Sequence, residues 1–266
     1  PTATTATLVD LVINAGSLDL NGFNQAFARI ANTSTTLVPN GAGRVVNTSA
    51  TAATLFLNNP ATSFSGVLGG SGGNNFSFDK SGNATLTLYS QNTYTGSTAI
   101  RGGTLELRDE ATLSGTSAVQ VNFATLLFNE TQLAGSNARI GTALLTLRGG
   151  TWTVNPRAEG EVTTNLAALN LDAGANTITF NSPQLGGGYN VTAPSLSRLS
   201  NDAVLNVTSG TFNLGRNLGA AEGGQGPIMT FTTAPTMING VIPWGVYQGS
   251  DFLTYLATPN ASSGNV

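Results

Sequence analysis

The stretch that decides the fold is NATLTLYSQNTYTGSTAIRGGTLEL, residues 83–107. One short phrase occurs in it twice, as TLTL near its start and as TLEL at its end. In both copies apolar and polar residues alternate, which places the leucines on one face of a β-strand. Between the copies lie Asn92, Gly96 and a glycine pair, residue types that favour turns over helix. The stretch therefore predicts two equivalent strands, with Leu86 and Leu105 19 residues apart.

The same apolar-x-apolar triplet returns along most of the chain. Triplets begin at Leu18, Leu37, Leu55, Phe76, Leu86, Leu105, Leu126 and Leu145, and later at Leu169, Ile178, Leu205 and Phe212. A strand that returns about every 20 residues indicates a solenoid, because one turn of chain cannot bury its apolar face without stacking on its neighbours. We predict an all-β fold, a right-handed parallel β-helix (β-solenoid) with irregular corner loops. Its handedness is expected from the general chirality of parallel crossovers.

We expect a single elongated domain with two parts. Residues 1–215 are predicted to form the β-helix repeat region, and residues 216–266 irregular β coils that lie between repeats or cap the helix. A glycine-rich linker is expected at 219–226, and the glycine-rich stretch 69–74 is expected to be a mobile loop leaving one corner. The inward positions of the first coils are predicted at Leu11, Ile13, Leu18, Leu20, Ile30, Val45, Leu55 and Leu57.

Five segments carry a resemblance to a known family. They are NTYTG at 92–96, SGNATLTL at 81–88, GTLEL at 103–107, SLDLNGFNQ at 17–25 and FSGVL at 64–68. Together they closely resemble the autotransporter-associated β-strand repeat, specifically over residues 17–107 and more loosely to about residue 215. The resemblance implies a secreted bacterial surface passenger with a β-helical stalk. It places the protein outside the cell, on the bacterial surface, anchored in the outer membrane through a region absent from this chain.

The composition excludes several classes of function. The net charge is −3 and Lys80 is the single lysine, so the electrostatic attraction that nucleic-acid binding requires is absent. The chain has no cysteine and no histidine, which removes the usual zinc sites and both Ser-His-Asp and Cys-His catalysis. Neither a secretory signal nor an apolar run long enough to cross a membrane is visible. We therefore expect a piece of a longer protein that makes no membrane contact itself.

Parallel β-helices can also carry polysaccharide-degrading sites, for which paired carboxylates are the candidate residues. Asp109 and Glu110 are neighbours and would point to opposite faces of a strand, whereas Glu159 and Glu161 would share one face. The second pair lies beside Arg157 in a predicted loop, which favours a solvated charge cluster. Trp152 is predicted to fill the core. We expect no enzyme activity and no catalytic, cofactor-binding or metal-binding residues, and no cofactor.

Rows of outward hydroxyl groups could form a surface that binds glycan or ice. Such a surface needs threonines in register on successive coils, and Glu106, Asn170 and Gln120 are expected to interrupt the rows. Threonine's preference for strands explains the Thr-x-Thr pairs adequately.

The sequence thus predicts a non-enzymatic structural and adhesive segment, a rigid stalk or fibre of a surface adhesin. The alternative is a β-helical protein that binds or degrades polysaccharide. The expected partners are neighbouring β-helix coils of the same long chain or other copies stacked end to end. A surface glycan or another cell is left open as a further partner.

Overall fold

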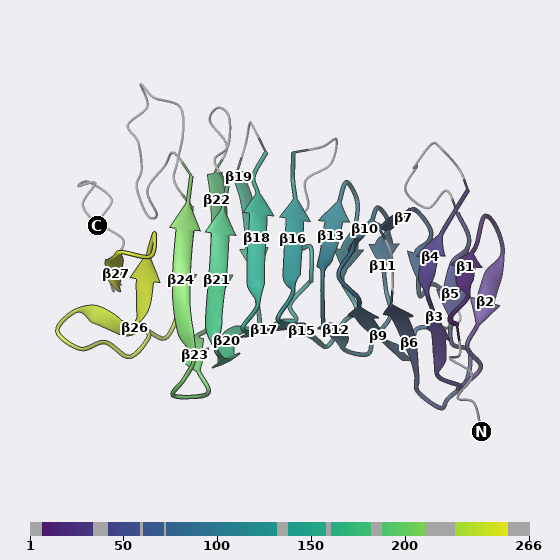
Figure 1. The fold of residues 1–266 in the computed structure, drawn as a ribbon, viewed down its shortest axis with the longest axis horizontal. Helices are drawn as coiled ribbons and strands as arrows, with labels where there is room; N and C mark the ends of the chain where they lie inside the picture. Colours follow the sequence, from purple (N-terminus) through teal and green to yellow (C-terminus); the bar gives the residue numbers. More distant parts are fainter. Residues whose placement is uncertain are drawn as a thin grey trace.

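The computed structural model describes residues 7–33, 42–58, 61–71, 73–131, 138–157, 161–181, 188–210 and 227–254. The triplets at Leu37 and Phe212, Glu159 and the predicted linker at 219–226 lie outside these ranges. In the described part of the chain every regular element is a β-strand and none is a helix. The strands stack along one long axis (Figure 1).

The strands line three faces of a parallel β-helix. The first face contains β1 (Asp10–Val12), β4 (Arg29–Ala31), β7 (Thr62–Phe64), β10 (Thr85–Leu88), β13 (Thr104–Arg108), β16 (Thr125–Asn129), β18 (Thr151–Asn155), β21 (Ala175–Phe180), β24 (Val204–Ser209), β26 (Val241–Tyr247) and β27 (Asp251–Thr254). The run from β7 to β27 is one nine-stranded sheet. Most of it faces the viewer in Figure 1.

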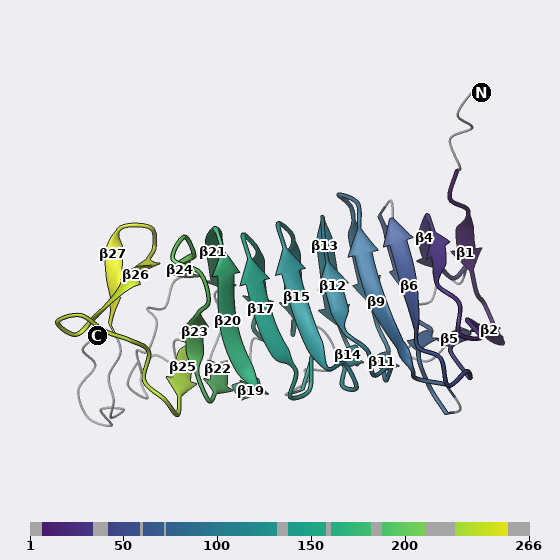
Figure 2. The ribbon, with the colours of Figure 1, turned by 90° about the horizontal axis from the view of Figure 1, so that it is seen from below.

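The second face is an eight-stranded sheet, seen most directly in Figure 2. It contains β3 (Gln25–Phe27), β6 (Ala53–Asn58), β9 (Phe76–Ser81), β12 (Thr98–Ile100), β15 (Ala118–Asn122), β17 (Leu144–Arg148), β20 (Ala168–Ala173) and β23 (Leu196–Arg198). The third face is built from shorter sheets. It contains β2 (Ser17–Asp19), β5 (Arg44–Val46), β8 (Val67–Leu68), β11 (Gln91–Asn92), β14 (Thr112–Leu113), β19 (Glu161–Asn165), β22 (Gly188–Ala193) and β25 (Ile228–Phe231).

The chain visits the three faces in order, so that from β1 to β15 and from β18 to β23 one strand of each face makes one coil. Every pair of named strands is parallel except β26 with β27. The structure thus confirms the predicted all-β parallel β-helix, while the right-handed sense stays an expectation. The division at residue 216 also stays a prediction.

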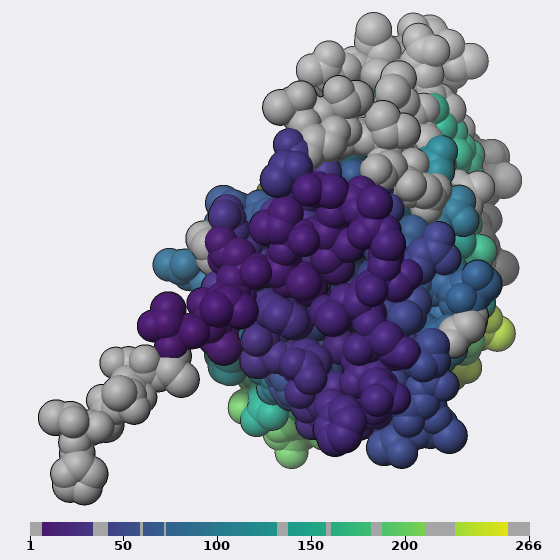
Figure 3. Space-filling model, turned by 90° about the vertical axis from the view of Figure 1, so that its right-hand side faces the viewer, coloured from purple at the N-terminus to yellow at the C-terminus, as the bar shows by residue number. Residues whose placement is uncertain are grey.

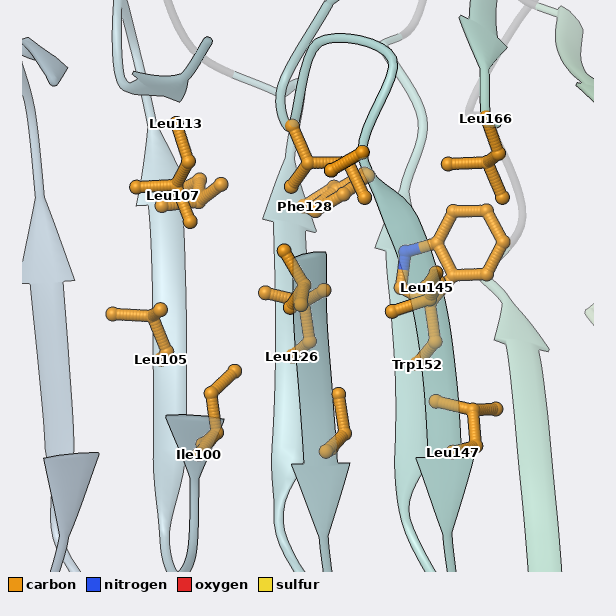
Figure 4. Packing of buried hydrophobic residues seen from close by; sticks show 14 of the residues in the cluster. Ile100, Leu105, Leu107, Leu113, Leu126, Phe128, Leu145, Leu147, Trp152 and Leu166 are labelled. Atoms are coloured by element: carbon orange, nitrogen blue, oxygen red, sulfur yellow. The ribbon is translucent and has the colours of Figure 1, made fainter. Parts of the chain in front are cut away.

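Inward side chains stack in ladders because the parallel pairs are in register. On the first face one ladder contains Leu86, Leu105, Leu126, Trp152, Ile178 and Val207. A second ladder, two residues further along each strand, contains Leu88, Leu107, Phe128, Val154 and Phe180. All of these side chains are buried, and Figure 4 shows part of the ladders meeting residues of the second face. The predicted inward positions of the first coils are also confirmed, with Leu11 and Leu18 partly buried against the core.

One part of the predicted periodicity needs correction. The structure pairs Leu126 with Trp152, whereas Leu145 belongs to the second face and pairs with Val119. The regular step from Leu126 to Leu145 therefore joins two faces of one coil and not two successive coils. The coil is longer at this point because residues 130–143 lie between its two named strands.

The prediction of a mobile loop at the glycine-rich stretch 69–74 is wrong for the residues of this stretch that the structure describes. The amide of Gly69 donates to the carbonyl of Val45 at 2.7 Å, and the amide of Gly70 donates to Oδ1 of Asn74 at 2.7 Å. A Cβ on Gly73 would lie 2.8 Å from backbone atoms of Asn47. These residues form a tight corner against the preceding coil, and do not leave it.

The register predicts how two neighbouring substitutions differ. Leu105 is fully buried in a ladder, whereas Glu106 points outward and is half-buried. Leu105→Asp removes apolar burial worth about 1.5–3 kcal/mol and adds the cost of an unpaired buried charge. Glu106→Ala loses hydrogen bonds from Thr87 and Asn129, worth about 0.5–1.5 kcal/mol each. Denaturant unfolding should give a clearly larger loss for Leu105→Asp, and equal losses would contradict the register.

Candidate functional site

The NTYTG motif forms a corner that ties successive coils together. Asn92 is fully buried on the third face. Its Oδ1 accepts a hydrogen bond from the amide of Leu68 at 2.8 Å, and its Nδ2 donates to the carbonyls of Ser90 at 2.6 Å and Thr112 at 3.1 Å. Leu68 and Thr112 belong to the coils before and after that of Asn92. One amide side chain thus satisfies backbone groups of three coils that would otherwise be buried without partners.

Tyr94 continues this corner into the core. Its ring stacks on Phe76 with a centroid distance of 5.3 Å. Its hydroxyl is hydrogen-bonded to Oγ1 of Thr98, which contacts Oγ1 of Thr116 at 3.0 Å. Burial raises the pKa of Tyr94, so the phenol remains neutral. A Cβ on Gly96 would lie 2.5 Å from the carbonyl oxygen of Phe76, so this position accepts only glycine. The motif therefore performs a structural task.

Lys80 is an exception inside the core. It occupies a ladder of the second face between Leu57 and Ile100, and its side chain is fully buried. Its Nζ donates to the carbonyls of Gly102 at 2.8 Å and Ser81 at 3.5 Å, and among the described residues no carboxylate forms an ion pair with it. Burial lowers the pKa of Lys80 from 10.5 to about 8, because a low-dielectric surrounding disfavours the charged form.

The lowered pKa predicts a pH dependence of stability. Between pH 8 and about pH 10 the unfolded chain keeps the Lys80 proton while the folded chain releases it. The free energy of unfolding should therefore increase with pH in this window. Above about pH 10 the trend should reverse, since Tyr94 and Tyr189, whose pKa values are raised by burial, then ionise more readily in the unfolded chain.

Lys80→Met is the variant that tests this dependence. It should lose the increase between pH 8 and 10 and be more stable than the wild type at pH 7, because an unpaired buried cation is replaced by an apolar side chain of similar length. Arg101→Met, on the surface, is the control and should keep the pH profile. Urea unfolding at several pH values measures both, and a flat wild-type profile would contradict the prediction.

A second buried charge is fully paired. Nε and Nη2 of Arg139 donate to the two carboxylate oxygens of Glu130 at 2.8 and 2.7 Å, and both side chains are fully buried. The remaining guanidinium hydrogens reach the carbonyls of Asp109, Ala111 and Asn129. The carbonyl of Arg139 accepts from the amide of Leu113, so Arg139 continues the third face after β14. Breaking a buried pair generally costs about 3–5 kcal/mol, which gives this pair a structural role.

Of the four acidic residues that the sequence offered as enzyme candidates, the structure describes Glu161, Asp109 and Glu110, and Glu159 lies outside the described ranges. Glu161 is exposed at the start of β19, where it accepts a hydrogen bond from Asn190. Asp109 lies in the turn after β13, 4.0 Å from Nε of Arg108, and its neighbour Glu110 is exposed. Glu130 is the one fully buried carboxylate within the described ranges, and Arg139 neutralises it. The described residues contain no cluster of acidic side chains suited to a metal ion.

Trp152 lies in the core, as predicted. Its ring contacts Phe128 and Phe180 edge to face, at centroid distances of 5.4 and 6.3 Å. The residue is fully buried, and its indole N–H has no hydrogen-bond partner among the described residues. It therefore cannot serve as a surface platform for a sugar.

The outward threonines are in better register than the sequence suggested. Thr85, Thr104, Thr125, Thr151 and Thr177 occupy equivalent positions on five successive strands of the first face. We call this row the threonine file. The expected interruptions by Gln120 and Asn170 do not occur in it, because both residues lie on the second face. Glu106 does interrupt the adjacent row, which also contains Thr87, Leu127 and Thr153.

A shallow groove of about 450 Å³ runs beside the threonine file, where the chain turns from the second face to the first. We call it the corner groove. It is lined by Gly103, Thr104, Phe123, Ala124, Thr125, Gly149 and Thr151. Phe123 is 75% exposed and has a φ of 50°. A bulky residue with a backbone in this left-handed region is a conformational outlier, and the strain costs about 1–3 kcal/mol. The corner groove therefore contains a strained residue.

The sequence contains a signal for Phe123 in the corners, outside the apolar triplets. The corner sequences of three successive coils are Gly-Gly-Thr at 102–104, Phe-Ala-Thr at 123–125 and Gly-Gly-Thr at 149–151. Their threonines are in register, which places Phe123 opposite Gly102 and Gly149. Alignment of the corners, and not of the strands, would have identified Phe123 as an exception.

Comparisons with known proteins agree with the repeat. Residues 78–107, from β9 to β13, match the family model of the passenger-associated-transport-repeat. This segment contains the NTYTG corner, and it lies within the range over which the sequence resembles autotransporter passengers. No curated protein and no solved structure gives a significant match. In the described part of the chain no helix is long and apolar enough to cross a membrane. The chain carries, at residues 78–107, the passenger-associated-transport repeat of autotransporter passenger proteins.

Proposed function

We propose that this chain is a non-enzymatic stalk segment of a secreted bacterial surface protein, which holds other parts of that protein away from the cell. The observation that carries the proposal is the pair of apolar ladders on the first face, which continues through successive coils from β10 to β21. Each coil is joined to the next by backbone hydrogen bonds and by buried side chains. Bending between coils would break both kinds of contact.

The type of repeat supports a proposed location at the cell surface. Passenger repeats of this kind belong to secreted, cell-surface proteins in general. We propose more specifically that this protein is held in the outer membrane by a region outside this chain. The low charge content of 9% and the many outward threonine and asparagine side chains suit a surface that is solvated without strong electrostatic fields.

The absence of catalysis is part of the proposal. Its support is that the chain has no histidine or cysteine, and that Trp152, Asn92 and Tyr94, which could be mistaken for site residues, are buried and structural.

Stiffness is the property that tests the stalk role. Because the chain has no cysteine, Val12→Cys and Val204→Cys can carry spin labels at two half-exposed positions of the first face. Eight strand steps separate β1 from β24, which predicts a separation of about 38 Å between the backbones. Double electron–electron resonance should give a narrow distance distribution near this value, broadened by the labels. Leu105→Asp in the same labelled chain should widen it. A broad distribution in the parent would contradict a stiff stalk.

The first coil offers a surface for another coil, seen end-on in Figure 3. Among the described residues no strand pairs with the outer edges of β1, β2 and β3. Val9 and Val12 are 65% and 46% exposed beside this edge, and Asp10 is engaged by Arg29 at 2.8 Å. Unprotected strand edges favour strand addition. We therefore propose that a further β coil, from the same long chain or another copy, stacks here.

Sedimentation tests the association between copies. The chain should self-associate at high concentration, and Val9→Lys with Val12→Lys should reduce this, because two lysines at a strand edge oppose strand addition. Leu199→Lys is the matched control, since Leu199 is exposed far from the first coil. The proposal fails if the wild type stays monomeric at every concentration, or if the edge variants assemble as the control does.

A further inference from the structure

We infer that the corner groove binds an uncharged glycan, with one sugar ring stacked on Phe123 and sugar hydroxyls hydrogen-bonded to Thr104, Thr125 and Thr151. The inference is independent of the stalk role, since a stiff segment can exist with or without a ligand on its surface. It rests on three observations: an exposed aromatic ring at a position that favours glycine, hydroxyl groups without partners, and a groove lined only by uncharged residues.

The first observation is the position of Phe123. Gly149 and Gly174 occupy the equivalent corners of the next two coils, with φ values of 58° and 69°. Phe123 has nearly the same backbone conformation, which phenylalanine adopts only with strain. Its ring lies over the backbone of Gly149, where a Cβ would be 2.5 Å from Cε1 of the ring. The ring is therefore supported by the next coil and yet 75% exposed, an arrangement that contributes little to the core.

The second observation is the state of the threonine hydroxyls. Within the described residues, no hydrogen bond occupies the hydroxyls of Thr104, Thr125 and Thr151. In the adjacent row, by contrast, Thr87 donates to Glu106 at 2.8 Å, and the hydroxyls of Thr179 and Thr208 bond to each other at 3.0 Å. The three free hydroxyls are spaced by the strand separation of about 4.8 Å. They form a row of donors and acceptors about 10 Å long, which suits two consecutive sugar units.

The third observation is the charge around the corner groove. All of its lining residues are glycine, alanine, threonine or phenylalanine. The nearest arginines in sequence are engaged elsewhere, since Arg101 pairs with Asp79 at 2.7 Å and Arg148 lies 3.8 Å from Asp172. The lining of the corner groove itself therefore presents no cation to an acidic sugar. Aromatic rings and hydroxyls together recognise a ligand with an apolar face and hydroxyl edges, which is the chemistry of a neutral sugar.

An ice surface is a less suitable occupant. Ice binding requires a flat and regular array, and the threonine file alone could supply one. The exposed ring of Phe123 stands at the edge of the file, and Glu106 and Leu127 lie in the adjacent row. These three side chains interrupt a flat repeat, whereas a flexible sugar chain can follow the corner groove beside them.

The experiment is a titration of the isotope-labelled chain, followed by amide NMR signals, with maltohexaose, cellohexaose and laminarihexaose as neutral probes and hexagalacturonate as an acidic probe. At least one neutral probe should shift the signals of residues 102–104, 123–125 and 149–151, with a dissociation constant of about 1 mM or tighter, as expected for a shallow site. All probes should be recovered uncleaved, which also checks the proposed absence of enzyme activity.

Two variants test the assigned contacts. Phe123→Gly should weaken binding about tenfold or more, because the stacking surface is lost, while the fold is kept, since the neighbouring coils already have glycine there. Thr125→Val keeps the shape and the strand preference and removes one hydroxyl, which should weaken binding about two- to tenfold. The matched controls are Phe252→Ala, an exposed aromatic elsewhere, and Thr177→Val, in the same file outside the corner groove. Both should bind as the wild type.

Several outcomes would overturn the inference. They are no binding of any neutral probe up to about 10 mM, signal shifts that map away from the corner groove, unchanged affinity in Phe123→Gly, and binding of hexagalacturonate alone. Thermal hysteresis of ice growth, lost in Thr125→Val, would assign the threonine file to ice. The distance distribution between labels at 12 and 204 is measured without ligand, so failure of glycan binding leaves the stalk role standing, and the reverse also holds.

Discussion

In-register parallel pairing is the constraint on which the rest of this structure depends. Neighbouring strands lie about 4.8 Å apart and side chains alternate between faces, so a slip of one residue would exchange every inward residue with an outward one. If β10 slipped by one residue on β13, Thr87 would enter the core in place of Leu88, while the leucines of β13 would stay inward. The register is therefore fixed by the burial of the leucines, and the outward residues are in line because the inward ones are. The threonine file is a consequence of the core.

The inward positions could be predicted from the sequence because they depend on alternation within single strands. Leu105, Leu126 and Ile178 are each identified by their immediate neighbours, and turn glycines mark where the strands end. The face on which a strand lies depends on the corner lengths instead, and these vary. The corner that contains Glu130 and Arg139 made Leu145 look like the successor of Leu126, although Trp152 is. The alternation within single strands cannot reveal which strand follows Leu126 on the first face. The intervening residues Glu130 and Arg139 form a buried ion pair and show no apolar alternation.

The corner groove could not be predicted from the alternation of residues within single strands. Its hydroxyls at Thr104, Thr125 and Thr151 are 21 and 26 residues apart, so they share no fixed period and come together only through the register of the strands. Phe123 lies in a corner, where the alternation of strands gives no information. It becomes visible only when the corners Gly-Gly-Thr, Phe-Ala-Thr and Gly-Gly-Thr are compared with one another. In a solenoid, corner positions repeat in space as strictly as strand positions do.

The residues that depart from the repeat are therefore the most informative ones of this fold. They fall into two kinds, those that point into the core and one that points into solvent. Lys80 interrupts an apolar ladder, but its ammonium group donates to two backbone carbonyls. Arg139 continues the third face as a charged residue, but Glu130 and three carbonyls satisfy it. Both exceptions point inward and find their partners within the chain. Phe123 departs from the repeat outward, with a strained backbone and most of its ring in solvent. Since the folded chain gains little from that ring, its partner is to be sought outside the chain.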